Sequence, residues 1–150
     1  MTEVLFYHLK NMSVESVLPS LLEKSLQRGW RAVVQTASEE RAEALDAHLW
    51  TYREDSFLPH VTWRTADAHD QPIVIAAAET NPNEAQIRFL VDCAGLPTDA
   101  ERYERVVLMF NGEDDEAVAG ARTAWKDGKA RGFDVTYWQA DERGRWQRRE

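Results

Sequence analysis

The sequence predicts an α/β protein with three layers, in which helices cover both faces of a mostly parallel sheet. Short apolar runs rich in β-branched and aromatic residues alternate along the chain with segments of helical period, which is typical of parallel strands joined by crossover helices. The length of 150 residues suits a single core. We therefore expect one α/β domain over residues 1–150.

The first strand and the first helix are predicted near the N-terminus. Residues 4–9, VLFYHL, form an apolar and aromatic run typical of a buried strand. From Val14 onward, apolar residues recur at the spacing of one helical face. Pro19 lacks the N–H that a helix interior requires, so we expect the regular helix to begin near Ser16 or Val17, with the proline in its first turn.

A second strand and helix follow a glycine. Gly29 ends the first helix, and the apolar run at residues 30–36 predicts a strand. Ser38 has the side chain of a helix N-cap and opens a helix that runs to Trp50. The segment 51–71 has no clear period and is expected to be a long connection. Long connections in compact domains are more often functional than idle.

The rest of the chain predicts further strands and one helix. Strands are expected at residues 72–77, 87–92, 106–110 and 133–138, where apolar residues cluster. A helix opens at Asp114 and stops at Gly132. For residues 141–150 two structures stay open, because residues 145–149 either pair back as a hairpin or project as a basic tail.

Composition and charge exclude several classes of protein. The chain has 18 basic and 26 acidic residues, a net charge of −8, so it should repel a phosphate backbone and we do not expect direct DNA binding. One cysteine excludes an internal disulfide. No apolar run approaches the ~18 residues of a membrane span, and the N-terminus lacks the pattern of a signal peptide. We expect a cytoplasmic protein without a membrane contact.

Motifs of cofactor, metal and nucleophile chemistry are absent from the sequence. A phosphate loop needs glycines after the first strand, and residues 8–13, HLKNMS, contain none. The four histidines are scattered without the i, i+4 spacing of a metal motif, and no Gly-x-Ser-x-Gly element occurs. The sequence therefore predicts no enzyme, no cofactor and no metal site.

Positive charge gathers near the C-terminus of this acidic chain. Residues 122–149 carry 8 basic and 4 acidic residues, a net of +4, whereas the remainder carries −12. Within the predicted helix, Arg122, Lys126 and Lys129 lie at i, i+4 and i+7 and share one face beside Trp125. Such a stripe can hold an acidic peptide that also has an apolar side chain. The alternative is a solvated face over a core tryptophan.

Two other interpretations stay open. Trp125, Trp138 and Trp146, together with the arginine-rich end, also suit a short single-stranded nucleic acid held by stacking and phosphate contacts. A second candidate surface combines Trp50, at a helix end, with residues 56–60, SFLPH. Exposed apolar groups in a loop indicate a partner protein. It is equally open that Trp50 closes the core under that loop.

Taken in order along the chain, these segments resemble the chi subunit family of bacterial DNA polymerase III. The segments that carry the resemblance are VLFYHL at residues 4–9, Leu49-Trp50, SFLPH at 56–60, Pro72-Ile73, and Ala121-Arg122-x-x-Trp125-Lys126 leading into Gly132-Phe133. The resemblance implies a sheet related to nucleoside-triphosphatase domains that has no phosphate loop. It also implies a non-catalytic accessory subunit of DNA replication.

The resemblance implies two partner sites. The acidic C-terminal tail of single-stranded-DNA-binding protein is expected to bind at Val118, Arg122, Trp125, Lys126 and Lys129. The psi subunit, or in its place a DNA repair helicase, is expected at Trp50, Phe57, Pro59 and His60. We therefore expect an adaptor that links the clamp loader to single-stranded-DNA-binding protein. The alternative function is a direct single-stranded nucleic-acid-binding module.

Overall fold

The computed structural model describes residues 2–10, 12–51, 60–65, 67–91, 95–140 and 145–149. Within these ranges one eight-stranded sheet has the order β3-β4-β2-β5-β6-β1-β7-β8. Its strands are β1 (Glu3–Leu9), β2 (Ala32–Gln35), β3 (His60–Thr62), β4 (Ile73–Ala76), β5 (Ile87–Leu90), β6 (Arg105–Asn111), β7 (Asp134–Ala140) and β8 (Trp146–Arg149). All neighbouring strands are parallel except β7 and β8, which are antiparallel.

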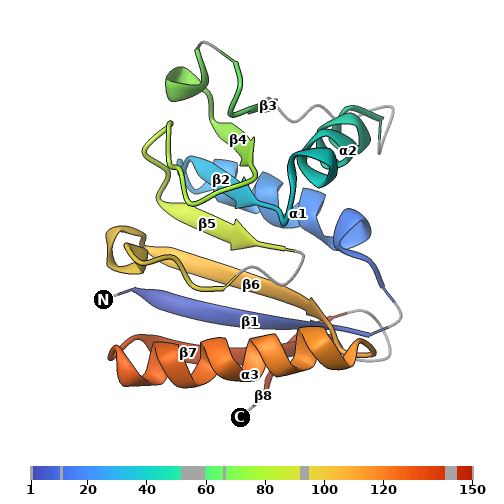
Figure 1. Ribbon diagram of the computed structural model, residues 1–150, viewed down its shortest axis with the longest axis vertical. Coiled ribbons are helices and arrows are strands. Elements are labelled where there is room, and N and C mark those ends of the chain that lie inside the picture. Colours follow the sequence, from blue (N-terminus) through green and yellow to red (C-terminus); the bar gives the residue numbers. More distant parts are fainter. Residues whose placement is uncertain are drawn as a thin grey trace.

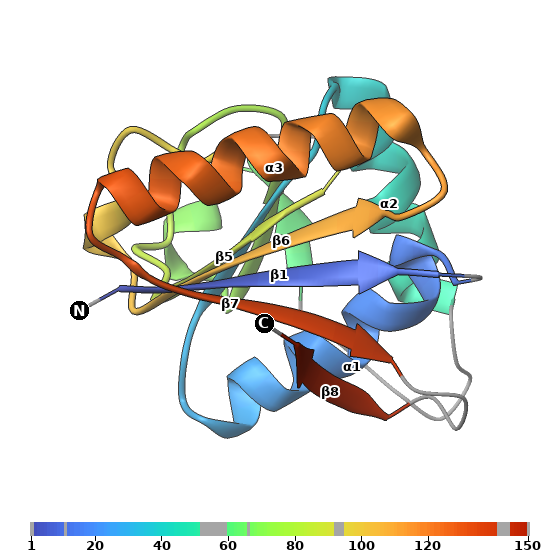
Figure 2. The ribbon, with the colours of Figure 1, turned by 90° about the horizontal axis from the view of Figure 1, so that it is seen from below.

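Helices cover both faces of the sheet, so the predicted three-layer α/β fold is confirmed. Helices α1 (Val14–Gln27) and α2 (Glu39–Thr51) pack on one face, and α3 (Asp115–Ala130) packs on the other. Figure 1 shows α3 running beside β1 and β7, and Figure 2 shows α3 and α1 on opposite sides of the sheet. Two hydrophobic clusters, one on each face, form the core.

Alternation along β1 sends successive side chains to opposite faces. Leu5 and Tyr7 belong to the cluster under α1 and α2, whereas Val4 and Phe6 belong to the cluster under α3. Because β1 is a central strand and helices cover both sides of the sheet, both faces of the strand are inside the fold. This explains why residues 4–9 are apolar on nearly every position rather than on alternate ones.

The prediction for the start of α1 is wrong. The helix begins at Val14, because Ser13 and Ser16 form a capping box in which each hydroxyl accepts from the other residue's backbone N–H, at 3.2 Å. Pro19 therefore lies in the helix interior and leaves the carbonyl of Glu15 without its usual N–H donor.

The C-terminal hairpin resolves an alternative that the sequence left open. Residues 146–149 form β8 and pair antiparallel with the end of β7, so this segment is a hairpin strand and not a projecting tail. Residues 141–144 lie outside the described residues. The long connection predicted for residues 51–71 contains β3 and a short 3-10 turn at Ala68–Asp70. A strand of three residues is too short to show a period in the sequence.

Candidate functional site

A pocket of about 340 Å³ opens on the α3 face of the sheet. It lies between α3 and the C-terminal halves of strands β1 and β6, next to the middle of β7. Its lining comprises Phe6, His8, Phe110, Gly112, Val118, Ala121, Arg122, Trp125 and Tyr137. Val118, Arg122 and Trp125, three of the residues predicted to bind an acidic peptide, are thus brought together in one cavity.

Aromatic rings form the wall of this pocket. The Trp125 ring packs edge-on against Phe6, with centroids 5.3 Å apart, and against Tyr137 at 6.4 Å. Trp125 is half-buried, so one part of its ring belongs to the core and another part faces the pocket. Trp125 therefore contributes both to the core and to the wall of the pocket.

The floor of the pocket depends on a close approach between His8 and Gly112. A Cβ atom at position 112 would come within 1.7 Å of the His8 ring, so only glycine leaves room for the imidazole there. The His8 Nδ1 is hydrogen-bonded to the Tyr137 hydroxyl and lies 3.2 Å from the side-chain amide of Gln139. Burial and the nearby Lys10 charge hold the pKa of His8 below its usual value, which keeps the ring neutral at physiological pH.

Basic side chains at the rim have no carboxylate partner in the described part of the chain. Arg122, Lys126 and Lys129 are exposed, and no ion pair to a described residue involves them. The Lys129 ammonium lies over the Trp125 ring at 5.4 Å, a cation–π contact. Lys126 does not line the cavity. By contrast, Arg131, the residue that follows α3, forms ion pairs with Asp127 and Glu101.

The arrangement suits an apolar side chain with a carboxylate beside it. An aromatic or aliphatic group can fill the cavity between the rings, and burying such a side chain contributes about 1.5–3 kcal/mol. Arg122 at the rim can then bind a carboxylate through two parallel N–H donors. Around the cavity the described residues offer no nucleophile and base pair, and nowhere in the described chain do three potential metal ligands gather.

Comparison with known proteins identifies the family. The family model described as "DNA polymerase III chi subunit, HolC" matches residues 1–136. The chain belongs to the chi subunit family of DNA polymerase III. It is 28% identical over 106 residues to the probable chi subunit of Rickettsia prowazekii, and the alignment covers 71% of this chain and 62% of that protein. It is 26% identical over 113 residues to the chi subunit of Pseudomonas aeruginosa, and the alignment covers 72% of this chain and 78% of that protein.

The fold also has a relative among solved structures. The C-terminal domain of the DEAD-box protein Dbp5 superposes with a TM-score of 0.60 at 14% identity and covers 92% of this chain and 90% of that one. The expected likeness to nucleoside-triphosphatase domains is thus confirmed for the fold. Membership of the chi family implies an accessory role in replication, and the chain spans 62% of the length of the Rickettsia relative. None of the described helices is long and apolar enough to cross a bilayer.

The second predicted partner surface is described in part. Trp50 lies at the end of α2 and is 47% exposed. Among the described residues it is the one large hydrophobic side chain that is largely open to solvent. His60 is buried; its ring lies 4.2 Å from that of Trp50, and its Nε2 lies 3.0 Å from the Asp46 carbonyl oxygen. The buried His60 ring therefore packs against the Trp50 indole and helps to hold it in place. Phe57 and Pro59 lie outside the described residues.

Sequence reasoning missed the strand residues of the pocket in this chi-family chain. Phe6, His8, Phe110 and Tyr137 come from three strands that are far apart in the sequence. A signal was present, because Phe6 and His8 are two residues apart in the first predicted strand and therefore lie on the same face. What the sequence does not give is which neighbouring strands β1 pairs with, and that pairing places Phe110 and Tyr137 on either side of His8.

Proposed function

We propose that this protein is a replication adaptor that links the clamp loader of DNA polymerase III to the acidic C-terminal tail of single-stranded-DNA-binding protein. The observation that carries the proposal is the α3 pocket, in which an apolar cavity adjoins the guanidinium of Arg122, a group that has no ion pair with any described residue. An acidic tail that ends in an aromatic residue supplies both groups this pocket lacks, a ring for the cavity and a carboxylate for the arginine.

The charge distribution favours a peptide over DNA at this site. Apart from residues 122–149, the chain carries a net charge of −12, which opposes an extended polyanion but not a short peptide that needs one local patch. Lys126 and Lys129 extend the positive charge along α3 beyond the cavity. They can attract the acidic residues that precede the anchoring side chain.

An adaptor needs a second surface, and Trp50 is the candidate. A half-exposed indole is the kind of side chain that anchors protein interfaces. The partner there is the psi subunit or, in its place, a DNA repair helicase. Trp50 lies on α2, on the face opposite α3, so both partners can bind together.

The test compares two single substitutions in two assays. Arg122→Ala should weaken binding of an acidic peptide ending in phenylalanine by ~1–3 kcal/mol, because a charge-assisted pair is lost, as measured by fluorescence titration. Trp50→Ala should leave that affinity unchanged and should instead abolish co-purification of the second partner from a native lysate. Each variant is the control for the other, because both side chains are exposed.

Two further arms define the peptide chemistry. Replacing the terminal phenylalanine by alanine should weaken binding through loss of the apolar anchor. Raising the salt concentration should weaken binding only in part, because the anchor is not screened. Unchanged affinity of Arg122→Ala, or binding that does not respond to salt, would exclude the α3 pocket as the site.

A further inference from the structure

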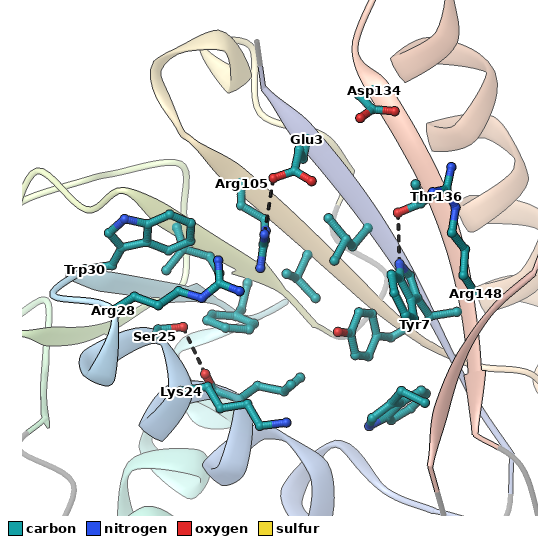
Figure 3. Close-up of a pocket in the computed structure, with 17 residues that line it drawn as sticks. Glu3, Tyr7, Lys24, Ser25, Arg28, Trp30, Arg105, Asp134, Thr136 and Arg148 are labelled. Carbon is teal, nitrogen blue, oxygen red and sulfur yellow. Dashed lines mark hydrogen bonds and ion pairs between the residues drawn. The ribbon is translucent and has the colours of Figure 1, made fainter.

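A second cavity, of about 380 Å³, lies on the opposite face of the sheet from the α3 pocket. The C-terminal half of α1, the loop before β2, and strands β1, β5, β6, β7 and β8 bound it. Its charged lining residues are Glu3, Lys24, Arg28, Arg105, Asp134 and Arg148. We call this cavity the α1 groove; Figure 3 shows it with its lining side chains.

Two guanidinium groups converge beside Trp30 in the α1 groove. Arg28 and Arg105 lie at 5.2 Å and 5.4 Å from the ring centroid of Trp30. In Figure 3 their guanidinium groups point toward each other, and the Tyr7 hydroxyl is turned toward the same space. Burial raises the pKa of Tyr7, and the nearby positive charges of Arg105 and Arg28 partly oppose this increase. Three donors thus surround one small volume.

These donors lack acceptors within the described part of the chain. Arg28 and Lys24 form no ion pair or side-chain hydrogen bond there, and neither does the Tyr7 hydroxyl. Arg105 pairs with Glu3 at 3.2 Å, but its Nε has no acceptor. Among the described residues, Glu3 and Asp134 also line the groove, but neither pairs with Arg28 or Lys24, and this leaves a position for an anionic ligand beside Arg28.

Planar rings flank this position on two sides. Trp30 lies at one end of the groove. At the other end the Tyr7 ring is 4.6 Å from that of Trp146 and is stacked with that of Trp138 at 6.3 Å. All three indoles are only partly buried. Indole faces and guanidinium planes are the surfaces on which nucleic-acid bases stack.

We propose that the α1 groove binds a nucleotide, with its phosphate on Arg28, Arg105 and the Tyr7 hydroxyl and its base against the neighbouring tryptophans. The nucleotide is either free or part of a single-stranded nucleic acid, since both present the same phosphate and base. The groove differs in chemistry from the α3 pocket, which has one arginine over a largely apolar cavity. A volume near 380 Å³ is within the range of small-molecule sites.

The inference is independent of the proposed peptide site, because strand alternation puts the two cavities on opposite faces. Leu5 and Tyr7 line the α1 groove, whereas Phe6 and His8 line the α3 pocket. It also changes what the net charge implies. The groove is a local concentration of positive charge on an acidic protein, so it suits one or a few nucleotides and not the wrapping of a long strand.

The experiment titrates the full chain with a short oligothymidylate, thymidine monophosphate and inorganic phosphate at low salt, with intrinsic tryptophan fluorescence as the readout. Arg28→Ala should weaken oligothymidylate binding about tenfold, because one charge-assisted contact is lost. Tyr7→Phe, which removes only the hydroxyl, should weaken it about threefold. Both substitutions preserve packing, since Arg28 is exposed and the Tyr7 ring is retained. A thermal unfolding curve checks this.

The matched control is Arg122→Ala, which removes the same charge from the other face and should leave nucleotide binding unchanged. Binding of thymidine monophosphate that responds to Arg28→Ala supports a site for single nucleotides. A response of the oligothymidylate alone supports single-stranded nucleic acid. The proposal is overturned if neither ligand binds, if Arg28→Ala has no effect, if inorganic phosphate binds as tightly as the nucleotides, or if Arg28→Ala weakens the acidic peptide instead.

Discussion

At the scale of single residues, the arginines of this protein divide by whether the fold supplies their acceptors. Arg88 on β5 is fully buried, and no carboxylate of a described residue pairs with it. Its guanidinium donates instead to the Gln35 side chain, to the Tyr103 hydroxyl and to the carbonyls of Ala78 and Thr80, at 2.6–3.1 Å. A buried charge satisfied in this way has a structural role, because it ties two loops to the sheet. By contrast, Arg28 in the α1 groove and Arg122 in the α3 pocket form no ion pair or side-chain hydrogen bond with a described residue.

His8 makes folding stability depend on pH. Its pKa is lowered in the folded protein, so the unfolded chain binds the proton more readily. The free energy of unfolding should therefore fall as the pH is lowered through the ordinary histidine pKa of about 6.5 and level off below the folded value. In His8→Asn the amide oxygen can replace Nδ1 as acceptor without titrating in this range.

Chemical denaturation of the wild type and of His8→Asn between pH 8 and pH 5 isolates this contribution, because all other titrating groups are shared. Toward acidic pH, the free energy of unfolding of the wild type should decrease relative to that of His8→Asn. A difference that stays constant over the whole range would show that the folded and unfolded chains bind the His8 proton equally well.

At the scale of elements, α1 shows how a side chain from a neighbouring helix repairs a proline. Pro19 cannot donate to the carbonyl of Glu15, one turn earlier. The Nε2 atom of His48 on α2 lies 2.9 Å from that carbonyl and replaces the missing donor. The proline is therefore tolerated inside the helix, because α2 packs against this turn.

A double-mutant cycle measures this repair. His48→Ala should lower the free energy of unfolding by about 1–3 kcal/mol, because the Glu15 carbonyl loses its partner. In a Pro19→Ala background the loss should be smaller, since the new backbone N–H at position 19 can bond the carbonyl. Urea denaturation of the four proteins gives the coupling energy. Equal losses in both backgrounds would mean that His48 acts elsewhere.

The same element shows where prediction from the sequence stops. Helical and strand periods located every long element of the sheet and all three helices, because burial on one or both faces leaves a pattern over many residues. The start of α1 could not be predicted, because the donor that rescues Pro19 comes from a helix more than twenty residues away. The three residues of β3 carry no period, and their place at the sheet edge depends on pairing with β4.

At the scale of the whole molecule, charge summed along the sequence predicted only one of the two cavities. Arg122 and Trp125 are neighbours on one helix, so their grouping is visible in the sequence. Lys24, Arg28 and Arg105 come from the segment whose net charge is −12, and they meet only because α1 lies over β6 in the fold. A sum over consecutive residues cannot detect a site whose basic groups come from two elements that are far apart in the sequence.

The opposite placement of the two cavities predicts that they bind their ligands together. The sheet separates them, and no residue lines both. Sites that share no contacts couple weakly, so a saturating acidic peptide should change the affinity for oligothymidylate by less than about twofold. The same protein would then hold the tail of a partner on one face and a nucleotide on the other.

Fluorescence anisotropy of a labelled oligothymidylate, measured with and without the peptide, tests this directly. Arg28→Ala should weaken binding of the oligonucleotide about tenfold and leave the affinity for the peptide unchanged. Arg122→Ala should weaken binding of the peptide and leave the affinity for the oligonucleotide unchanged. Both affinities should decrease with salt, more steeply for the oligonucleotide, because its binding relies on phosphate contacts and the peptide also has an apolar anchor. Mutual competition between peptide and oligonucleotide would instead show that both ligands occupy one surface, and would assign it to the face whose arginine variant loses both.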